Sequence, residues 1–434
     1  MKKTLALLMA LVMVFALCAC GQSATTQAPA ATQAPAEAAP AEAAPAEAAA
    51  PAEAPAEAVK MTIALRSGTY ADVIESCLPA FEAENNVTVE VLKLDEADLR
   101  SNIAMDAPNA QGTYDLVMVD GSWTADFATS GVMADLTSLG YELDEDIIPA
   151  TTAVCVIDGE TYFAPYYGNV TVLLYNKDLV AAAGFTGDTI ANLDDIMTIC
   201  KAAQDAGKKG FIYRGDSNSN YVTDFLPILL SFGGWVLDEN GAPSANTPEF
   251  KAAMEFYLEL IATGDAEVRD DLKATIENGN GAMGIGWPGW WSPANTGSEY
   301  GALTGVAHAG DPSYLANVYG IWTIGVPANT THPELAVKLL SYLMDKDVQL
   351  ETIPGGGVPC RYSCLQDESV LAEHPEFKVV CAALENGKYR PVIPQWPQMY
   401  EIIGTEMSNI IAGTKTVDQG LDDAQSHLES DIEW

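Results

Sequence analysis

The pattern of hydrophobic and polar positions changes its period several times in the first part of the folded region. Short apolar runs at 61–65, 87–92 and 115–119 predict β-strands. Between the first two runs, apolar residues at helical spacing predict a helix over 73–84. Strand, helix and strand in this order predict an α/β fold with a parallel sheet covered by helices.

Three later segments have the sequence features of helix starts. The segments 247–249 and 331–334 each place Thr shortly before Pro and Glu, the order that suits an N-cap, a first helical position and a first turn. The segment 416–419 fits a capping box. Apolar residues at helical spacing follow each start, so we expect three amphipathic helices that pack on the core.

Polar residues stand where two of the predicted strands end. Ligands of open α/β sheets bind outside the carboxyl ends of the strands. Residues 66–70 follow the first strand and 120–123 follow the third. We therefore expect both segments to lie close to any binding site in this part of the chain.

The first twenty residues have the pattern of a secretory signal. Lys2 and Lys3 precede an apolar run at 5–17, which is too short to span a bilayer as a helix. The end of this run resembles the bacterial lipoprotein signal, with Cys20 at the lipidated position; an ordinary signal peptide that ends in cysteines is the alternative. Residues 21–58 are rich in Ala, Pro and Glu and predict a disordered tether, because nothing in them can form a core.

The charge balance limits the possible partners. The 434 residues include 21 Lys and Arg against 60 Asp and Glu, a formal net charge of −39. Nucleic acid and anionic lipid both require clustered basic residues, so neither is an expected partner. No second apolar run is long enough to span a bilayer. We expect contact with the membrane only through the lipid anchor.

The sequence contains no motif for a cofactor, a metal or a catalytic nucleophile. The Gly-x-Gly-x-x-Gly match at 279–284 is followed by Ile-Gly-Trp-Pro, which cannot open the helix that a dinucleotide site needs. The four histidines are scattered, and we expect no metal. Six cysteines remain after the signal, and spacing leaves open whether they pair; they are Cys77, Cys155, Cys200, Cys360, Cys364 and Cys381.

The tryptophans avoid the predicted helices and stand in loop-like contexts beside Gly, Pro or Asp. Indole rings on loops are either packed beneath the loop or presented to a ligand. Sugars suit such a surface, because their apolar C–H faces stack on indole while their hydroxyls need fixed polar groups. Candidates for those polar groups are Arg66, Asp120, Asn169 and Arg361; the loop tryptophans are Trp123, Trp287, Trp290, Trp291, Trp322 and Trp396.

Four stretches together make the chain recognisable, namely 114–123, 162–179, 319–327 and 390–396. Residues 59–434 resemble the extracellular solute-binding proteins of ATP-driven (ABC) importers, in particular the carbohydrate-binding, maltose-type family. The resemblance implies a two-lobed periplasmic-binding-protein fold with hinge crossovers and a ligand cleft. The implied lobes are a first lobe at 59–165, a second lobe at 166–315, a return to the first lobe at 316–355, and C-terminal helices of the second lobe at 356–434.

The resemblance also implies positions for the ligand-binding residues. Asp120 and Trp123 match the end of a first-lobe strand at the cleft, and Tyr167 and Asn169 match the first crossover. Several relatives carry an acid at the position of Asn169. The other carried-over positions are a stacking aromatic in the second lobe at Trp290 or Trp291, Trp322 on the return crossover, a sugar-contacting Arg361, and a pocket-lining Trp396.

The expected function is capture of a sugar or oligosaccharide by a monomer outside the cytoplasm, with delivery to ABC permease subunits in the membrane. A ligand that touches both lobes favours the closed arrangement, and no bond is made or broken. Two alternatives stay open. A lipid-anchored glycoside hydrolase would need two carboxyl groups across the cleft, and a binder of a non-sugar solute in the same family would need other pocket groups.

Overall fold

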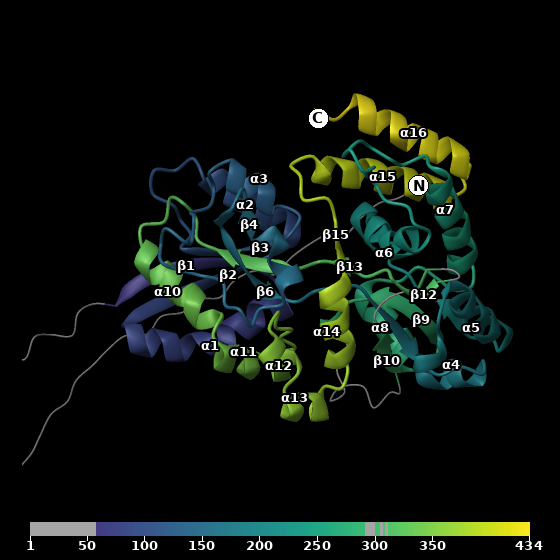
Figure 1. Ribbon diagram of the computed structural model, residues 1–434, viewed down its shortest axis with the longest axis horizontal. Coiled ribbons are helices and arrows are strands. Elements are labelled where there is room, and N and C mark those ends of the chain that lie inside the picture. Colours follow the sequence, from purple (N-terminus) through teal and green to yellow (C-terminus); the bar gives the residue numbers. More distant parts are fainter. Residues whose placement is uncertain (1–57, 291–299, 304–306, 309–310) are drawn as a thin grey trace, which may run out of the picture. The chain divides into compact units, whose positions relative to one another are not determined.

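The computed structural model describes residues 58–290, 300–303, 307–308 and 311–434, and for 300–315 it describes the backbone alone. The predicted signal, Cys20 and most of the tether, up to residue 57, lie outside the described residues. Glu57–Trp434 forms one compact unit. Two separate β-sheets, each with its own helices, make up this unit (Figure 1).

The first sheet has five strands in the order β2–β1–β3–β14–β6. β1 pairs in parallel with β2 and β3, whereas β14 runs antiparallel between β3 and β6. The three strands predicted from apolar runs are confirmed. Their bounds and those of the two later strands are β1 Val59–Arg66, β2 Val87–Leu94, β3 Leu116–Asp120, β6 Phe163–Tyr167 and β14 Trp322–Gly325.

Helices lie on both faces of this sheet, with α2 and α3 above it and α1 and α11 below it in Figure 1. Buried strand residues such as Ile63 and Val117 share one hydrophobic core with Phe81 and Leu339, which come from two helices of this lobe. The helices of this lobe are α1 Thr69–Asn85, α2 Glu96–Asp106, α3 Thr124–Thr129, α10 Pro333–Leu343, α11 Lys346–Thr352, α12 Tyr362–Leu365, α13 Glu368–Glu373 and α14 Phe377–Asn386. The lobe also contains two short 3₁₀ turns, η1 Pro149–Val154 and η4 Ile353–Gly355, and a hairpin of β4 Val156–Ile157 and β5 Glu160–Thr161.

The second sheet has four strands in the order β10–β7–β9–β8, and a separate hydrophobic core joins it to its helices. The strands are β7 Val172–Asn176, β8 Lys209–Phe211, β9 Gly281–Gly286 and β10 Tyr300–Leu303, beside the hairpin β11 Ala307–His308 and β12 Asp311–Leu315. The helices are α4 Lys177–Ala182, α5 Leu193–Asp205, α6 Asn218–Ser231, α7 Pro248–Ile261, α8 Arg269–Glu277, α15 Trp396–Ile411 and α16 Val417–Ser430, with 3₁₀ turns η2 Gly187–Thr189 and η3 Pro288–Trp290.

Three chain segments cross between the lobes, and backbone hydrogen bonds connect them. The first, 168–171, connects β6 to β7, the second includes β13 Val318–Tyr319, and the third includes β15 Lys388–Tyr389. β13 pairs in parallel with β15, and the Thr171 N–H donates to the Val318 carbonyl at 2.9 Å. The predicted two-lobed α/β fold with hinge crossovers is therefore confirmed.

Two of the three helix starts behave as their sequences predict. The Thr247 side chain accepts from the Phe250 N–H, with Pro248 in the first turn, and Thr416 forms a capping box with Gln419. His332 differs, because its ring caps no N–H group and instead faces the carboxylate of Asp115 at 3.1 Å. Local spacing thus located the helices, while the partner of His332 depends on tertiary contact.

The C-terminal segment divides between the lobes in a way that its helical pattern did not indicate. We expected all of 356–434 in the second lobe. The structure places α12 and α14 in the hydrophobic core of the first lobe, and only α15 and α16 in that of the second. Helical periodicity shows which face of a helix is apolar, but not which core that face joins.

The six cysteines after the signal are buried free thiols. In the described part of the chain, no cluster of three or more His, Cys, Asp or Glu side chains has the arrangement of a metal site. Among the same residues, no helix combines the length and the apolar character needed to cross a membrane.

Glu376 at the start of α14 makes the stability of this fold sensitive to pH. Burial raises the pKa of its carboxyl from the usual 4.5 to about 7, although His374 contacts it at 3.0 Å. The folded state therefore binds a proton that the unfolded state releases between these two values. We expect the free energy of unfolding to fall as pH rises from about 4.5 to about 7.

Glu376→Gln should remove this part of the pH dependence. Thermal unfolding of both proteins at pH 5 and pH 8 measures it, and Glu373→Gln, an exposed acid on the neighbouring helix, is the matched control. An equal change in melting temperature between the two pH values in all three proteins would contradict the prediction.

Candidate functional site

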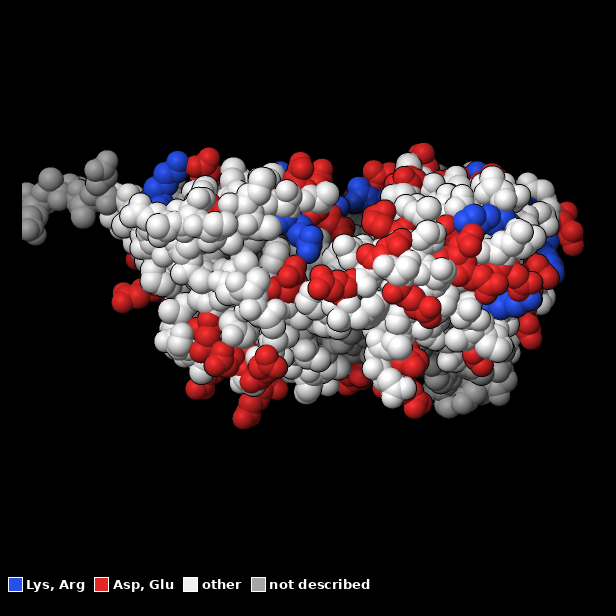
Figure 2. All heavy atoms as spheres, turned by 90° about the horizontal axis from the view of Figure 1, so that it is seen from above, with Lys and Arg blue, Asp and Glu red and all other residues white. Residues whose placement is uncertain are grey.

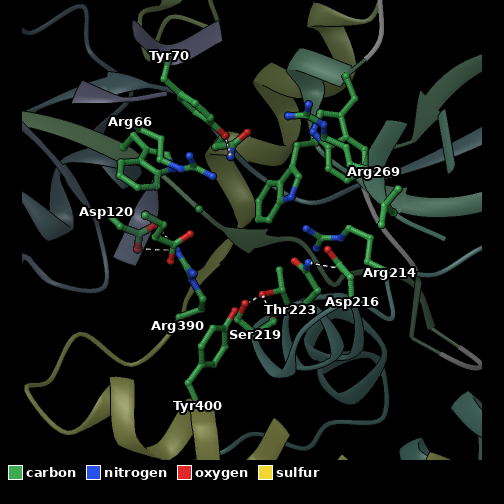
Figure 3. Close-up of a pocket in the computed structure, with 18 of the residues that line it drawn as sticks. Arg66, Tyr70, Asp120, Arg214, Asp216, Ser219, Thr223, Arg269, Arg390 and Tyr400 are labelled. Carbon is green, nitrogen blue, oxygen red and sulfur yellow. Dashed lines mark hydrogen bonds and ion pairs between the residues drawn. The ribbon is translucent and has the colours of Figure 1, made fainter. Parts of the chain in front are cut away.

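A cavity of about 400 Å³ lies between the two lobes, and we call it the central cavity. Its wall combines indole rings with eight charged side chains, and residues of both lobes contribute (Figure 3). The residues that line it are Arg66, Tyr70, Glu96, Asp120, Asn169, Arg214, Asp216, Ser219, Asn220, Thr223, Val268, Arg269, Asp270, Trp287, Trp290, Gly320, Trp322, Arg390 and Tyr400.

Strand ends of the first sheet supply one wall of the central cavity. Arg66 is the last residue of β1 and Asp120 the last residue of β3. Trp322 begins β14, which runs antiparallel, so it stands at the same edge and pairs with Asp120 on one side and Tyr167 on the other. The prediction that a ligand would meet the carboxyl ends of these strands agrees with the position of the cavity.

A buried ion pair between Asp120 and Arg390 holds this wall in place. One Arg390 Nη donates to both carboxylate oxygens, at 2.8 and 2.9 Å, and the backbone N–H and hydroxyl of Ser122 also donate to Asp120. Burial by itself lowers the pKa of Arg390, but the charge of Asp120 outweighs it and raises that pKa above the usual range. Arg390 directly follows β15, so the pair joins the third crossover to the first sheet.

Aromatic side chains form a continuous row of tilted and edge-on ring contacts behind the same wall. Trp123, Trp322, Tyr70 and Tyr167 follow one another with ring centroids 4.6 to 5.6 Å apart. The Tyr70 hydroxyl accepts from the Asn169 amide at 3.0 Å, and burial raises the pKa of Tyr70 to about 12. These contacts leave 4% of Trp322 exposed, so this ring offers only a small part of its surface to the cavity.

The second lobe provides the opposite wall. Trp287 and Trp290 follow β9, and the Arg214 guanidinium lies over the Trp290 ring at 5.3 Å. Arg214 is itself fixed by Asp224 of α6, to which its guanidinium and its backbone N–H donate. Burial raises the pKa of Asp224 even though the charge of Arg214 opposes the shift. One face of the Trp290 indole is therefore occupied by a paired cation.

Glu96 adds a carboxyl group whose charge is disfavoured. It is the first residue of α2 and lines the central cavity. Desolvation by the surrounding cavity walls, followed by the charge of Asp120, raises the pKa of Glu96, although part of this residue stays accessible to solvent; Arg390 and Arg66 act in the opposite direction. The group can therefore serve a ligand as a hydrogen-bond acceptor or, once protonated, as a donor.

Two further cavities adjoin the central one and share residues with it. The first, which we call the apolar side cavity, has a volume of about 700 Å³, shares Glu96, Arg390 and Tyr400 with the central cavity, and includes Met105 and Trp123. The second, which we call the arginine side cavity, has a volume of about 310 Å³. Its lining is Arg66, Ser67, Gly68, Thr69, Tyr70, Tyr167, Asn169, Arg269, Trp287, Gly289 and Trp290.

The structure brings together five of the residues that the sequence suggested for ligand binding. Arg66, Asp120, Asn169, Trp290 and Trp322 line the central cavity. Tyr167 lines the arginine side cavity, and its hydroxyl donates to the Gly356 carbonyl. Trp123 and Trp396 line the apolar side cavity, where Trp396 is buried in the first turn of α15.

The remaining suggestions lie elsewhere. Arg361 lines none of the three cavities, because its guanidinium is held by Asp144, by Asp146 and by the Met344 carbonyl in the first lobe. We therefore leave Arg361 out of the candidate site. Trp291 falls in a segment outside the described residues.

Several residues of the central cavity were not selected from the sequence. Tyr70 and Arg390 belong to the segments 66–70 and 390–396, which the sequence indicates, but the sequence assigns neither residue a role in ligand binding. Glu96, Arg214, Arg269 and Tyr400 had no local motif. The arginines among them could have been noticed because arginine is rare in this chain, which has six, and four of the six line this cavity.

Comparison with known proteins agrees with the fold and identifies the family. Residues 64–350 match the family described as bacterial extracellular solute-binding protein. The chain belongs to this family. It is thus a substrate-binding protein of the ABC-transporter type, and the family places it outside the cytoplasm.

Relatives of this solute-binding protein match over nearly their full length. A binding protein of Brucella abortus (strain 2308) is 25% identical over 86% of this chain and 92% of its own. A protein of Sinorhizobium fredii named as an amino-acid ABC transporter periplasmic-binding protein is 21% identical over 81% and 84%. The family is therefore clear, and the name of the Sinorhizobium protein refers to amino acids rather than to a sugar.

Two solved structures show the same fold. A solute-binding protein of Agrobacterium radiobacter K84 in complex with ribitol has a TM-score of 0.78 at 24% identity, covering 87% of this chain and 100% of its own. Maltose-bound MalE3 of T. maritima has a TM-score of 0.76 at 23% identity, covering 86% and 100%. At these identities the likeness extends to the fold alone.

The Asp120–Arg390 pair gives a prediction about the stability of this solute-binding protein. Arg390→Met leaves the Asp120 carboxylate buried without its cation, which should lower the free energy of unfolding by about 3–5 kcal/mol near neutral pH. Urea unfolding measures the change.

The double variant Asp120→Asn with Arg390→Met removes both charges and should regain part of that loss, because no unpaired charge is left behind. Asp120→Asn alone completes the comparison. If the changes in unfolding free energy of Arg390→Met and Asp120→Asn simply add in the double variant, the side chains are not coupled and the prediction is wrong.

Proposed function

We propose that this solute-binding protein captures a sugar or oligosaccharide in the central cavity and delivers it to an ABC permease. One observation carries the proposal: Trp287, Trp290 and Trp322 meet in a cavity that is otherwise lined by charged and hydroxyl-bearing side chains. Indole edges and faces suit the apolar C–H surface of a sugar, and the polar groups suit its hydroxyls.

The combined cavities have room for a single sugar ring or for more than one. The central cavity continues into the apolar side cavity and into the arginine side cavity through shared wall residues. The ligands named for the two solved neighbours, ribitol and maltose, are a polyol and a disaccharide, which belong to the same hydroxyl-rich chemistry. A mono- or oligosaccharide is therefore the ligand class that we propose.

The mechanism that we propose uses the three crossovers as hinges. A sugar that contacts both lobes favours the closed arrangement through its differential affinity for it. The closed form would then dock on the permease, and separation of the lobes would release the sugar. In this mechanism the protein acts as a monomer and makes or breaks no bond.

A glycoside hydrolase is the competing function, because Glu96 and Asp120 both line the central cavity. Asp120 is poorly suited to act as a nucleophile, since Arg390 and Ser122 already donate to its oxygens. A non-sugar solute is the second alternative, in keeping with the name of the Sinorhizobium relative. We favour sugar binding because the family is one of binding proteins and the cavity combines indoles with many polar groups.

Saccharides should stabilise the protein against heat. At a hundred times its dissociation constant, a ligand adds about 2.7 kcal/mol to the free energy of unfolding. A thermal-shift screen over mono- and oligosaccharides, with amino acids and polyols beside them, identifies the ligand. Tryptophan fluorescence then measures its affinity, because three indoles line the cavity.

Trp290→Leu should weaken the binding of that saccharide at least tenfold, because it removes an indole from the wall. The control is Trp235→Leu, which removes an indole that contacts Lys388 and lines none of the three cavities. No shift with any saccharide, or release of a chromogenic aglycone from a glycoside, would contradict the proposal.

We also propose that a lipid on Cys20 anchors the protein to the outer face of the cell membrane. The pattern of the first twenty residues supports this, since Cys20 follows small residues at the end of the apolar run. Cys20→Ser should move the protein from the membrane fraction to the soluble fraction. Cys18→Ser is the matched control and should stay with the membrane; equal fractionation of the two variants would refute the anchor.

A further inference from the structure

Arginine is concentrated at the ligand site of a chain that has little of it. The chain contains six arginines, and four of them line the central cavity, namely Arg66, Arg214, Arg269 and Arg390. A random distribution of six arginines over 434 residues would place fewer than one on a wall of nineteen residues. None of the lysines lines this cavity.

Two of the four arginines are already neutralised by buried acids. Arg390 is paired with Asp120, and Arg214 is paired with Asp224. Each of these two pairs fixes one wall of the cavity, which accounts for the presence of Arg390 and Arg214. The other two arginines can donate to the hydroxyls of a neutral sugar, but a pair of cations without a buried acid also suits an anionic group.

Arg66 and Arg269 line the arginine side cavity as well as the central cavity, and they come from different lobes. Figure 3 shows Arg66 and Arg269 entering from opposite sides of the site. The eleven residues that line the arginine side cavity include no Asp, no Glu and no Lys. In a chain with 60 acids, a cavity that holds two arginines and no carboxylate is a distinctly cationic pocket.

Neither guanidinium has a strong partner in the described part of the protein. Arg66 donates to the Ser67 hydroxyl at 2.9 Å, and no carboxylate there lies within ion-pair distance of it. Arg269 pairs with its own neighbour Asp270, but the two side chains are 59% and 77% exposed. Exposed pairs of this kind contribute little, so both guanidinium groups can bind another anion.

The charge of the whole molecule works against an anionic ligand, so local cations are needed to hold one. On the face shown in Figure 2, acidic side chains are more numerous than basic ones. Such a surface repels anions at long range. Two guanidinium groups that line one pocket can offset this repulsion at short range, because an arginine fork matches a carboxylate through two parallel hydrogen bonds.

We propose that the saccharide carries an anionic group, and that Arg66 and Arg269 hold this group in the arginine side cavity. This inference rests on the proposed function and names its substrate class: acidic sugars, with the carboxylate of a uronic acid as the group that fits best. The neutral hydroxyls of the same sugar lie in the central cavity. There the Asp216 carboxylate can accept hydrogen bonds, and Glu96 can accept them or, once protonated, donate one; neither residue lines the arginine side cavity.

Matched pairs of sugars that differ only in charge test the proposal. Calorimetric titration compares glucose with glucuronate, galactose with galacturonate and mannose with mannuronate, as monomers and as dimers. Galactose 6-sulfate and galactose 6-phosphate show whether another anion replaces the carboxylate. At least one acidic sugar should bind ten times more tightly than its neutral partner.

Two variants assign the preference to this pocket. Arg66→Gln and Arg269→Gln should each reduce the affinity for the acidic sugar at least ten times more than the affinity for its neutral partner, while Arg66→Lys should retain part of the preference. Lys60→Gln removes one positive charge outside the three cavities and should change neither affinity.

The possible failures are distinguishable. If neutral sugars bind and no acidic partner binds more tightly, the charge inference is overturned and the proposed function stands. The inference also fails if Arg66→Gln weakens both members of a pair equally, because the arginine is then a general part of the wall. If no sugar of either kind binds, the proposed function fails first.

Discussion

The carboxylate of Asp120 lies almost fully buried at the end of β3, and the site depends on the cation that neutralises it. A buried charge without a partner loses its hydration and is strongly destabilising. The partner, Arg390, stands 270 residues later, directly after β15. Because β15 pairs with β13, this one ion pair links the first sheet, the second crossover and the third crossover. The hinge and the cavity wall are therefore parts of the same structure.

The second lobe repeats the arrangement with Arg214 and Asp224. Asp224 lies on α6, and its partner Arg214 follows β8 and covers one face of Trp290. Each wall of the cavity therefore has its own buried ion pair that orients a guanidinium, with Asp120 bound to a residue of the third crossover and Arg214 bound within the second lobe. Pairs of this kind fix geometry more than they add stability, since their desolvation offsets most of the attraction. Rigid walls on two hinged lobes are what a ligand needs in order to distinguish the closed arrangement from the open one.

Sequence reasoning succeeded where the controlling interactions are local. The strands β1, β2 and β3, the cap at Thr247 and the capping box at Thr416 all follow from neighbouring residues. Arg66 and Asp120 were found because strand ends have a fixed place in an α/β sheet. Arg390 and Arg214 were missed as site residues because their partners and positions depend on how distant segments pack. Arg361 was expected at the ligand and lies in an ion pair with Asp144 for the same reason.

The exposure of the indoles changes the balance of recognition that the sequence suggested. Several tryptophans were expected to present their rings to a sugar. Trp322, Trp287 and Trp290 do line the cavity, but 4%, 8% and 9% of each is exposed, since the rings pack on their neighbours. Rings that expose so little offer only small apolar surfaces, which do little to distinguish one sugar from another. Discrimination among ligands must then come mainly from the charged groups, and among these Arg66 and Arg269 are the two that no buried acid of the described structure neutralises.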